Sequence, residues 1–157
     1  VITYLGDGNN VAYSLALFCC QLGIDLRIGA PEKYQFEGTF IVTLNERAGS
    51  TLISQTDDPR AAAEGAHFIY TDVWTSMGQE AESKQRLADL ADFQVNRAIM
   101  EVAHNDVKFL HCLPARRGEE VTAEVIDGNQ SAIIQQANNR LHAQKGLLVW
   151  LMTEASK

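Results

Sequence analysis

The sequence predicts one doubly wound α/β domain, in which a mostly parallel sheet of about five strands carries helices on both faces. Short apolar runs of β-prone residues alternate along the chain with longer stretches of helical character. Glycine or proline stands at several junctions between these stretches. No internal repeat or low-complexity linker divides residues 1–157, so we treat them as a single domain.

Composition argues against several classes of protein. The chain has 157 residues, 46% hydrophobic and 21% charged, which is enough for one folded core. Its net charge of -7 and pI near 5.0 disfavour nucleic acid as a partner. No apolar run approaches the ~20 residues that span a bilayer, so we expect no membrane association and a cytoplasmic location. The three cysteines, with Cys19 and Cys20 adjacent, indicate reduced thiols rather than disulfides or a zinc site.

The first thirty residues predict a β-α-β unit. Residues 1–5 read as a strand, residues 11–22 as a helix closed by Gly23, and residues 24–29 as a second strand. Such a unit implies parallel strands joined by a right-handed crossover. The turn between the first strand and the helix, residues 6–10, lacks the third glycine of a dinucleotide-binding fingerprint, which argues against a nucleotide cofactor. Because the chain opens directly on a strand at Val1, we expect a piece of a longer protein.

The remaining elements continue the alternation. The helix over residues 57–64 has Asp58 as its N-cap and Pro59 at its first position. We expect the charges of the amphipathic helix over residues 80–90 to serve solubility only. The other predicted helices cover residues 32–49, 95–103, 121–126 and 136–152, and the strands cover 51–56, 67–70 and 107–112, with a strand or turn at 131–134.

Two loops follow predicted strands at the edge where open α/β sheets bind ligands. In residues 71–78, Asp72 offers a carboxylate for an ammonium group, and Ser76, Met77 and Gly78 could close over a small molecule. The plain alternative is a strand-to-helix loop with an N-cap. Together with the loop after the strand at 107–112, this edge gathers polar residues, namely Asp7, Asn9, Asn10, Asp72, Ser76, His111 and Cys112.

The sequence lacks the motifs of several common catalytic mechanisms. The sequence has no Walker loop, no nucleophile elbow and no His/Glu pair at helical metal spacing. Neighbours on a strand point to opposite faces, so Cys112 and His111 are not expected to form a nucleophilic pair. Arg140 is either an ordinary surface arginine or a guanidinium fork directed at a carbonyl or anion.

Taken together, the motifs resemble the carboxyl-terminal half of the ornithine carbamoyltransferase family, in order and over essentially the whole chain. The Ser-Met-Gly loop and the His-Cys-Leu-Pro turn carry most of this resemblance. The matching stretches are Gly6-Asp7-Gly8-Asn9-Asn10, Asp72 through Ser76-Met77-Gly78, His111-Cys112-Leu113-Pro114, and Asn139-Arg140.

The resemblance implies carbamoyl transfer from carbamoyl phosphate to the δ-amino group of L-ornithine, within arginine biosynthesis and without metal or organic cofactor. Asn10 and Asp72 are then expected to hold the amino-acid end of ornithine, with contacts from Ser76 and Met77 as the loop closes. Cys112 and Leu113 are expected beside the δ-amino group and the carbamoyl moiety, and Arg140 is expected to reach carbamoyl phosphate. Cys112 and Arg140 are the candidate catalytic residues.

Two departures from the family limit what the chain is expected to do. Asn138 stands where the family commonly has Glu. The family's phosphate-binding Ser-Thr-Arg-Thr motif is absent, so we expect the chain alone to be inactive. The resemblance also implies that the full-length protein is a homotrimer. The alternatives are a carbamoyltransferase with another amine acceptor and a non-catalytic amino-acid-sensing domain on the same scaffold.

Overall fold

The computed structural model describes residues 1–75, 78 and 80–155, except for the side chain of Glu80. Ser76 and Met77, the central residues of the predicted loop, lie outside the described residues. Their expected contacts with ornithine therefore stay predictions.

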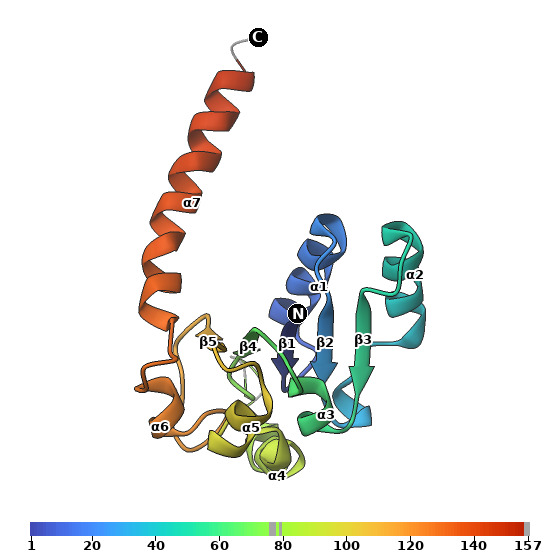
Figure 1. The fold of residues 1–157 in the computed structure, drawn as a ribbon, viewed down its shortest axis with the longest axis vertical. Helices are drawn as coiled ribbons and strands as arrows, with labels where there is room; N and C mark the ends of the chain where they lie inside the picture. The colour runs from blue at the N-terminus through green and yellow to red at the C-terminus, as the bar shows by residue number, and fades with distance from the viewer. Residues whose placement is uncertain (76–77, 79, 156–157) are drawn as a thin grey trace.

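Five parallel strands form one sheet in the order β3-β2-β1-β4-β5 (Figure 1). The order of the strands reverses between β1 and β4. A doubly wound sheet binds ligands at such a point, beside the carboxyl ends of the strands. The prediction of a parallel five-stranded sheet is confirmed. The strands are β1 (Ile2–Leu5), β2 (Leu26–Gly29), β3 (Ile53–Thr56), β4 (Phe68–Thr71) and β5 (Lys108–His111).

Helices cover both faces of the sheet, as predicted. One apolar cluster joins the sheet to α1 and α2, and a second joins it to α3, α5 and α6. Tyr4 belongs to the first cluster and its neighbour Leu5 to the second, as the alternation of side chains along a strand requires. The helices are α1 (Asn10–Leu22), α2 (Gly38–Ala48), α3 (Pro59–Ala63), α4 (Ser83–Leu90), α5 (Arg97–Val102), α6 (Ala123–Ile126) and α7 (Ile133–Glu154), with 3-10 turns η1 (Glu32–Tyr34), η2 (Glu80–Glu82) and η3 (Ala91–Phe93).

The predicted helix ends agree well with the structure. Gly23 closes α1 in the left-handed conformation, and Asp58 caps α3 ahead of Pro59. The single helix expected over residues 32–49 is instead a 3-10 turn followed by α2, because the extended backbone at Gln35 and Glu37 separates the two. Residues 131–134 were expected to form a strand or turn. In the described chain, Ser131 forms one isolated bridge to Phe109, and α7 begins at Ile133.

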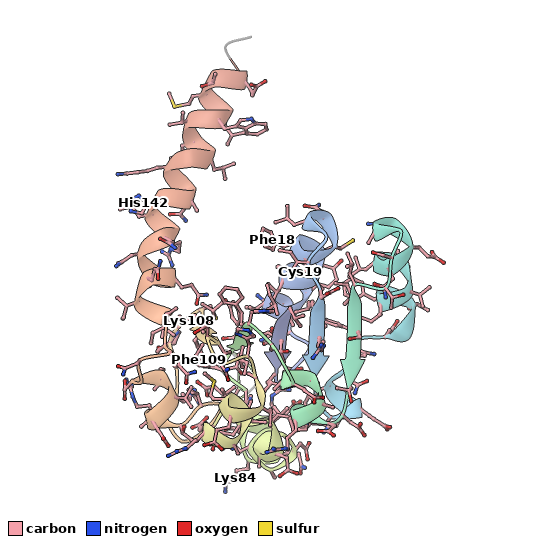
Figure 2. All side chains as sticks on the ribbon, in the orientation of Figure 1. Phe18, Cys19, Lys84, Lys108, Phe109 and His142 are labelled. Carbon is pink, nitrogen blue, oxygen red and sulfur yellow. The ribbon has the colours of Figure 1, made fainter. Side chains whose placement is uncertain are left out.

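The helix α7 leaves the body of the domain and extends away from it (Figures 1 and 2). Ile133 is its buried residue, while His142 is exposed. Large apolar side chains are exposed along its last turns, at Leu147, Leu148, Val149, Trp150, Leu151 and Met152. We call these residues the apolar end of α7. No helix in the described chain is both long and apolar enough to cross a membrane.

Candidate functional site

Asp72 lies directly after β4, at the carboxyl edge of the sheet, and only 8% of it is exposed. Its Oδ1 accepts hydrogen bonds from the Val73 amide (2.8 Å) and the Cys112 thiol (3.0 Å). Its Oδ2 accepts one from the Asn9 side-chain amide (2.9 Å). Among the described residues, no cationic side chain forms an ion pair with Asp72. A nearly buried carboxylate surrounded by neutral donors favours a cationic ligand.

The two asparagines of the β1–α1 turn have different positions. Asn9 caps α1, because its Oδ1 accepts from the amides of Val11 and Ala12 while its Nδ2 donates to Asp72. Asn10 is the first residue of α1 and is exposed. The helix amino terminus carries partial positive charge, so Asn10 stands where a ligand carboxylate is favoured.

Cys112 follows β5 and connects the two neighbouring strand ends through its bond to Asp72. Desolvation by burial, followed by the hydrogen bond to the Asp72 carboxylate, raises the pKa of the thiol to about 12. A thiol with this pKa stays protonated at neutral pH and is a poor nucleophile. The arrangement therefore suits Cys112 as a hydrogen-bond donor and contact residue, not as a covalent catalyst.

Two tyrosines lie close to Asp72, of which Tyr4 is buried and Tyr70 is half-buried. The hydroxyl of Tyr4 donates to Asn9 Oδ1 (3.2 Å), and the Tyr4 and Tyr70 ring centroids lie 6.0 Å apart. Desolvation and the nearby Cys112 raise the pKa of Tyr70 to about 12. We call Tyr4, Asn9, Tyr70, Asp72 and Cys112 the edge cluster. The tyrosines were not predicted as site residues, because in the sequence they are ordinary apolar strand positions.

Arg140 lies on α7 and lines a cavity of about 830 Å³ together with Cys112 and Leu113. Residues predicted from two separate motifs therefore share one cavity. The start of α7 is fixed beside this cavity by Gln136, which donates to the Tyr70 hydroxyl (2.9 Å) and accepts from the His111 amide (3.0 Å). Arg140 stands four residues further along α7, is exposed, and makes no ion pair within the described chain.

Arg86 on α4 corrects the prediction that the charges of residues 80–90 serve solubility only. It is 5% exposed and forms an ion pair with Asp7, and its Nε donates to the carbonyl of Trp74. Its guanidinium also lies over the Tyr34 ring, 4.9 Å from the centroid. Arg86 thus ties the turn after β1 to the segment that follows Asp72. A helix with many charges looks amphipathic in sequence, and the buried charge is visible only once α4 is placed.

One group of side chains meets the distance requirement for a metal site but lacks free ligand atoms. Ligand atoms of Asp72, His111 and Cys112 lie within 4.8 Å of one another. The Nδ1 lone pair of His111 already accepts from the Leu113 amide, and Nε2 lies against Glu120. Only two ligands remain, fewer than the four of a structural zinc site.

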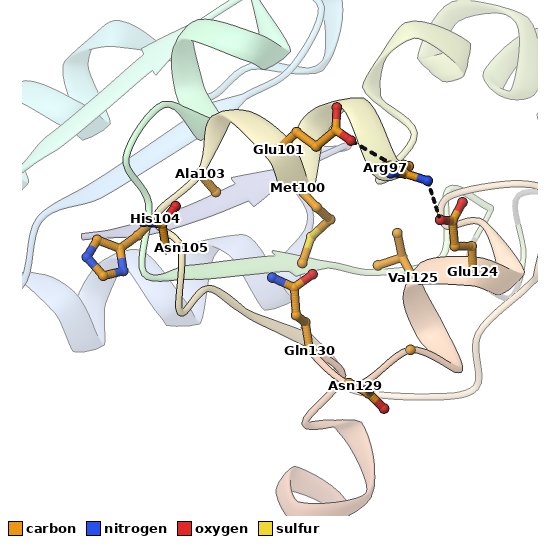
Figure 3. Close-up of a pocket in the computed structure, with 11 residues that line it drawn as sticks. Arg97, Met100, Glu101, Ala103, His104, Asn105, Glu124, Val125, Asn129 and Gln130 are labelled. Atoms are coloured by element: carbon orange, nitrogen blue, oxygen red, sulfur yellow. Dashed lines mark hydrogen bonds and ion pairs between the residues drawn. The ribbon is translucent and has the colours of Figure 1, made fainter.

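A second cavity, of about 620 Å³, lies between α5, α6 and the residues that precede β5 (Figure 3). Figure 3 shows Arg97 bridging Glu101 and Glu124 at its rim, with Met100 nearby. This cavity includes His104 and Asn105, which come before β5, so it lies at the amino end of that strand. None of the predicted site residues lines it.

The structure therefore brings Asp72 next to Cys112, and Cys112, Leu113 and Arg140 around one cavity. Asn10 stands at the α1 terminus, where its neighbour Asn9 contacts Asp72. The residues that sequence reasoning missed are Tyr4, Tyr70, Arg86, Glu120 and Gln136, and they support the site through burial or a hydrogen bond to a predicted residue.

A parallel sheet in this order, with a carboxylate and a thiol hydrogen-bonded to each other at its switch point, defines a doubly wound α/β domain with a candidate ligand site at that edge. Comparison with known families identifies the family to which this domain belongs. Residues 1–151 match the model of the aspartate/ornithine carbamoyltransferase family's Asp/Orn binding domain. The chain belongs to that family.

Curated relatives carry the name ornithine carbamoyltransferase. The chain is 51% identical to that of Listeria innocua, over 96% of this chain and 49% of the relative. It is 51% identical to that of Bacillus subtilis, over 94% of this chain and 47% of the relative. The chain thus spans about half the length of the curated relatives it matches.

Solved structures of the family have the same fold. Ornithine carbamoyltransferase from Pyrococcus furiosus matches with a TM-score of 0.85 and 45% identity, over 94% of this chain and 48% of that one. The anabolic ornithine carbamoyltransferase from Campylobacter jejuni matches with a TM-score of 0.89 and 31% identity, over 98% of this chain and 51% of that one.

Proposed function

We propose that residues 1–157 are the ornithine-binding half of a carbamoyltransferase. The observation that carries this proposal is Asp72, an almost buried carboxylate whose described partners are all neutral. The α-ammonium of an amino acid would supply the missing charge, and the α1 terminus at Asn10 would face its carboxylate. The names of the relatives at about 50% identity favour ornithine over aspartate as the acceptor.

The proposed reaction transfers a carbamoyl group from carbamoyl phosphate to the δ-amino group of L-ornithine. The δ-ammonium first loses a proton, and the neutral amine then attacks the carbamoyl carbon. The bond from that carbon to the phosphate oxygen breaks, and the second amine proton passes to the leaving phosphate as citrulline forms. Catalysis of this kind depends on positioning and on stabilising the developing negative charge. In our proposal Cys112 and Leu113 contact the reacting end of ornithine, and the Arg140 guanidinium stabilises charge on carbamoyl phosphate. Closure by Ser76 and Met77 would exclude water and favour the neutral amine.

We further propose that the carbamoyl phosphate site lies mainly in a second domain outside residues 1–157. The apolar end of α7 supports this, because six consecutive large apolar side chains are exposed there. Exposed apolar patches of this kind mark interaction surfaces. We propose that the second domain covers them and closes the cavity that Arg140 lines. A homotrimeric, cytoplasmic full-length protein is proposed from the family resemblance alone.

Calorimetric titration with a panel of acceptors tests the proposal. We expect L-ornithine to bind at least tenfold more tightly than putrescine or L-aspartate, and carbamoyl phosphate alone to bind weakly. Tight binding of an unrelated amino acid, with no preference for ornithine, would instead support the amino-acid-sensing alternative. A nucleotide-binding domain would bind NAD or ATP.

A turnover assay tests the proposal that a second domain is needed. The purified chain should make no citrulline above the level of a variant that lacks both Cys112 and Arg140. Adding the amino-terminal half of a relative, such as that of Bacillus subtilis, should restore some activity. Citrulline formation by the chain alone would contradict this part of the proposal.

A further inference from the structure

Glu120 is a fully buried acidic residue for which the proposed reaction has no direct use. It is 0% exposed and lies in the segment after the His111-Cys112-Leu113-Pro114 turn. Its Oε1 lies 3.2 Å from His111 Nε2 and also accepts from the Arg116 amide. Among the residues that the structure describes, its Oε2 has no hydrogen-bond partner. Burying a carboxylate with one unpartnered oxygen is unfavourable, so this residue calls for an explanation.

The other ring nitrogen of His111 determines where its proton is. Nδ1 lies 2.8 Å from the backbone nitrogen of Leu113, and a backbone amide can only donate. Nδ1 is therefore the acceptor, and the ring proton is on Nε2, where it is donated to Glu120. A buried carboxylate at Nε2 stabilises this tautomer, since the alternative would place two lone pairs against each other.

This tautomer allows the Leu113 amide to donate a hydrogen bond to His111 Nδ1, and Leu113 has a strained backbone conformation. Leu113 has a φ of 61°, the only positive value among the non-glycine residues that the structure describes. A branched side chain disfavours this conformation, so it needs support from its surroundings. The Leu113 amide donates to His111 Nδ1 at the start of this turn. Cys112, whose thiol donates to Asp72, lies between the two bonded residues.

We propose that Glu120 is a positioning residue of the acceptor site. By holding His111 with its proton on Nε2, it keeps Nδ1 available for the Leu113 amide. The turn then places Cys112 against Asp72 and Leu113 in the wall of the cavity shared with Arg140. This inference rests on the proposed function, because ornithine binding is the property that the turn would control.

Nitrogen NMR of the histidine ring reports the tautomer of the chain independently of any ligand. We expect the wild type and Glu120→Gln to show a protonated Nε2 and an unprotonated Nδ1 at His111, since the Gln carbonyl can replace Oε1. Glu120→Ala should show a mixture of tautomers. An Nδ1-protonated ring in the wild type would overturn the proposal even if ornithine binds.

Ornithine titration measures the consequence of the tautomer. We expect at least a tenfold loss of affinity for Glu120→Ala and no more than a threefold loss for Glu120→Gln. Wild-type affinity in a folded Glu120→Ala variant would overturn the proposal. A wild type with the expected tautomer but no ornithine binding would overturn the proposed function and, with it, the role of Glu120 in acceptor binding.

Two variants of His111 keep the proposal falsifiable if Glu120→Ala does not fold. The Oδ1 of His111→Asn can replace Nδ1 as the acceptor for Leu113, whereas His111→Gln extends its amide towards Glu120. We expect His111→Asn to bind ornithine at least fivefold more tightly than His111→Gln. Equal affinities of the two folded variants would show that the Nδ1 bond does not position the turn.

Discussion

The edge cluster and the apolar end of α7 differ in how many contacts they make within the described chain. In the edge cluster, Asn9, Asp72 and Cys112 are joined by hydrogen bonds from three strand ends, and tyrosines lie behind them. In α7, Arg140 and the residues that follow it up to Glu154 are exposed. One part of the proposed site is therefore organised by this domain alone. The other part has residues in place, but the described residues provide no surface opposite them.

The largest effect should appear at the Cys112 thiol. With a pKa of about 12 instead of the usual ~8.5, it should react with iodoacetamide at pH 8 about a thousandfold more slowly than a free thiol. The rate should keep rising with pH until the thiol ionises near pH 12. Asp72→Asn removes the negative charge and should accelerate the reaction. Peptide mapping after timed alkylation separates Cys112 from Cys19 and Cys20, and alkylation at the rate of a free thiol would show that the edge cluster is open.

Arg86 should be the next most sensitive residue. Arg86→Met leaves the partly buried Asp7 carboxylate without its counter-ion, so we expect a loss of about 3 kcal/mol in unfolding free energy by urea denaturation. The matched control is Arg97→Gln, since the pair of Arg97 with Glu101 is exposed and its loss should leave the urea midpoint unchanged. Equal midpoints for the two variants would mean that Arg86 does not secure the segment after Asp72.

Arg140 should show a smaller effect, confined to turnover. In the full-length protein, or with the amino-terminal half supplied, Arg140→Gln should lower kcat about a hundredfold, as loss of one donor to a developing charge does. Ornithine affinity and stability of the chain should not change. Lys145→Gln, on the same exposed helix but outside the cavity, is the control and should retain full activity. A matching loss in Lys145→Gln would indicate a general effect on α7.

The smallest effect on stability is expected at Trp150. The residue is 60% exposed, so Trp150→Glu should change the unfolding free energy of the chain by less than about 0.5 kcal/mol. Exposed apolar patches promote association between molecules, so we also expect the substitution to reduce self-association of the purified chain. The buried Ile133 of the same helix is the contrast, because Ile133→Ala should cost about 2 kcal/mol. Sedimentation and urea denaturation measure the two properties. Similar destabilisation by both substitutions would show that Trp150 packs within the chain.

The sequence was sufficient for the sheet, most helix ends and the placement of Asp72 and Cys112. These depend on local signals such as the cap at Asp58, the glycine at Gly23 and the polar residues that follow a strand. It also predicted Arg140 near Cys112, through the resemblance and not through spacing.

The missed residues depend on contacts between distant segments. Arg86 lies 79 positions from Asp7, and Gln136 lies 66 from Tyr70, and no periodic pattern links such residues. Glu120 follows another glutamate, and the sequence gives no sign that Glu119 is partly exposed and Glu120 fully buried. The buried charges could be found only after the helices and loops had been placed.

The most direct test of the central claim, that Asp72 binds the α-ammonium of ornithine, compares two ligands by calorimetry. 5-Aminopentanoate has the carboxylate and the distal amine of ornithine but lacks its α-amino group. We expect the wild type to prefer ornithine at least tenfold and Asp72→Asn to bind the two ligands within a factor of three. An unchanged preference for ornithine in Asp72→Asn, or an equal loss of affinity for both ligands, would contradict the claim.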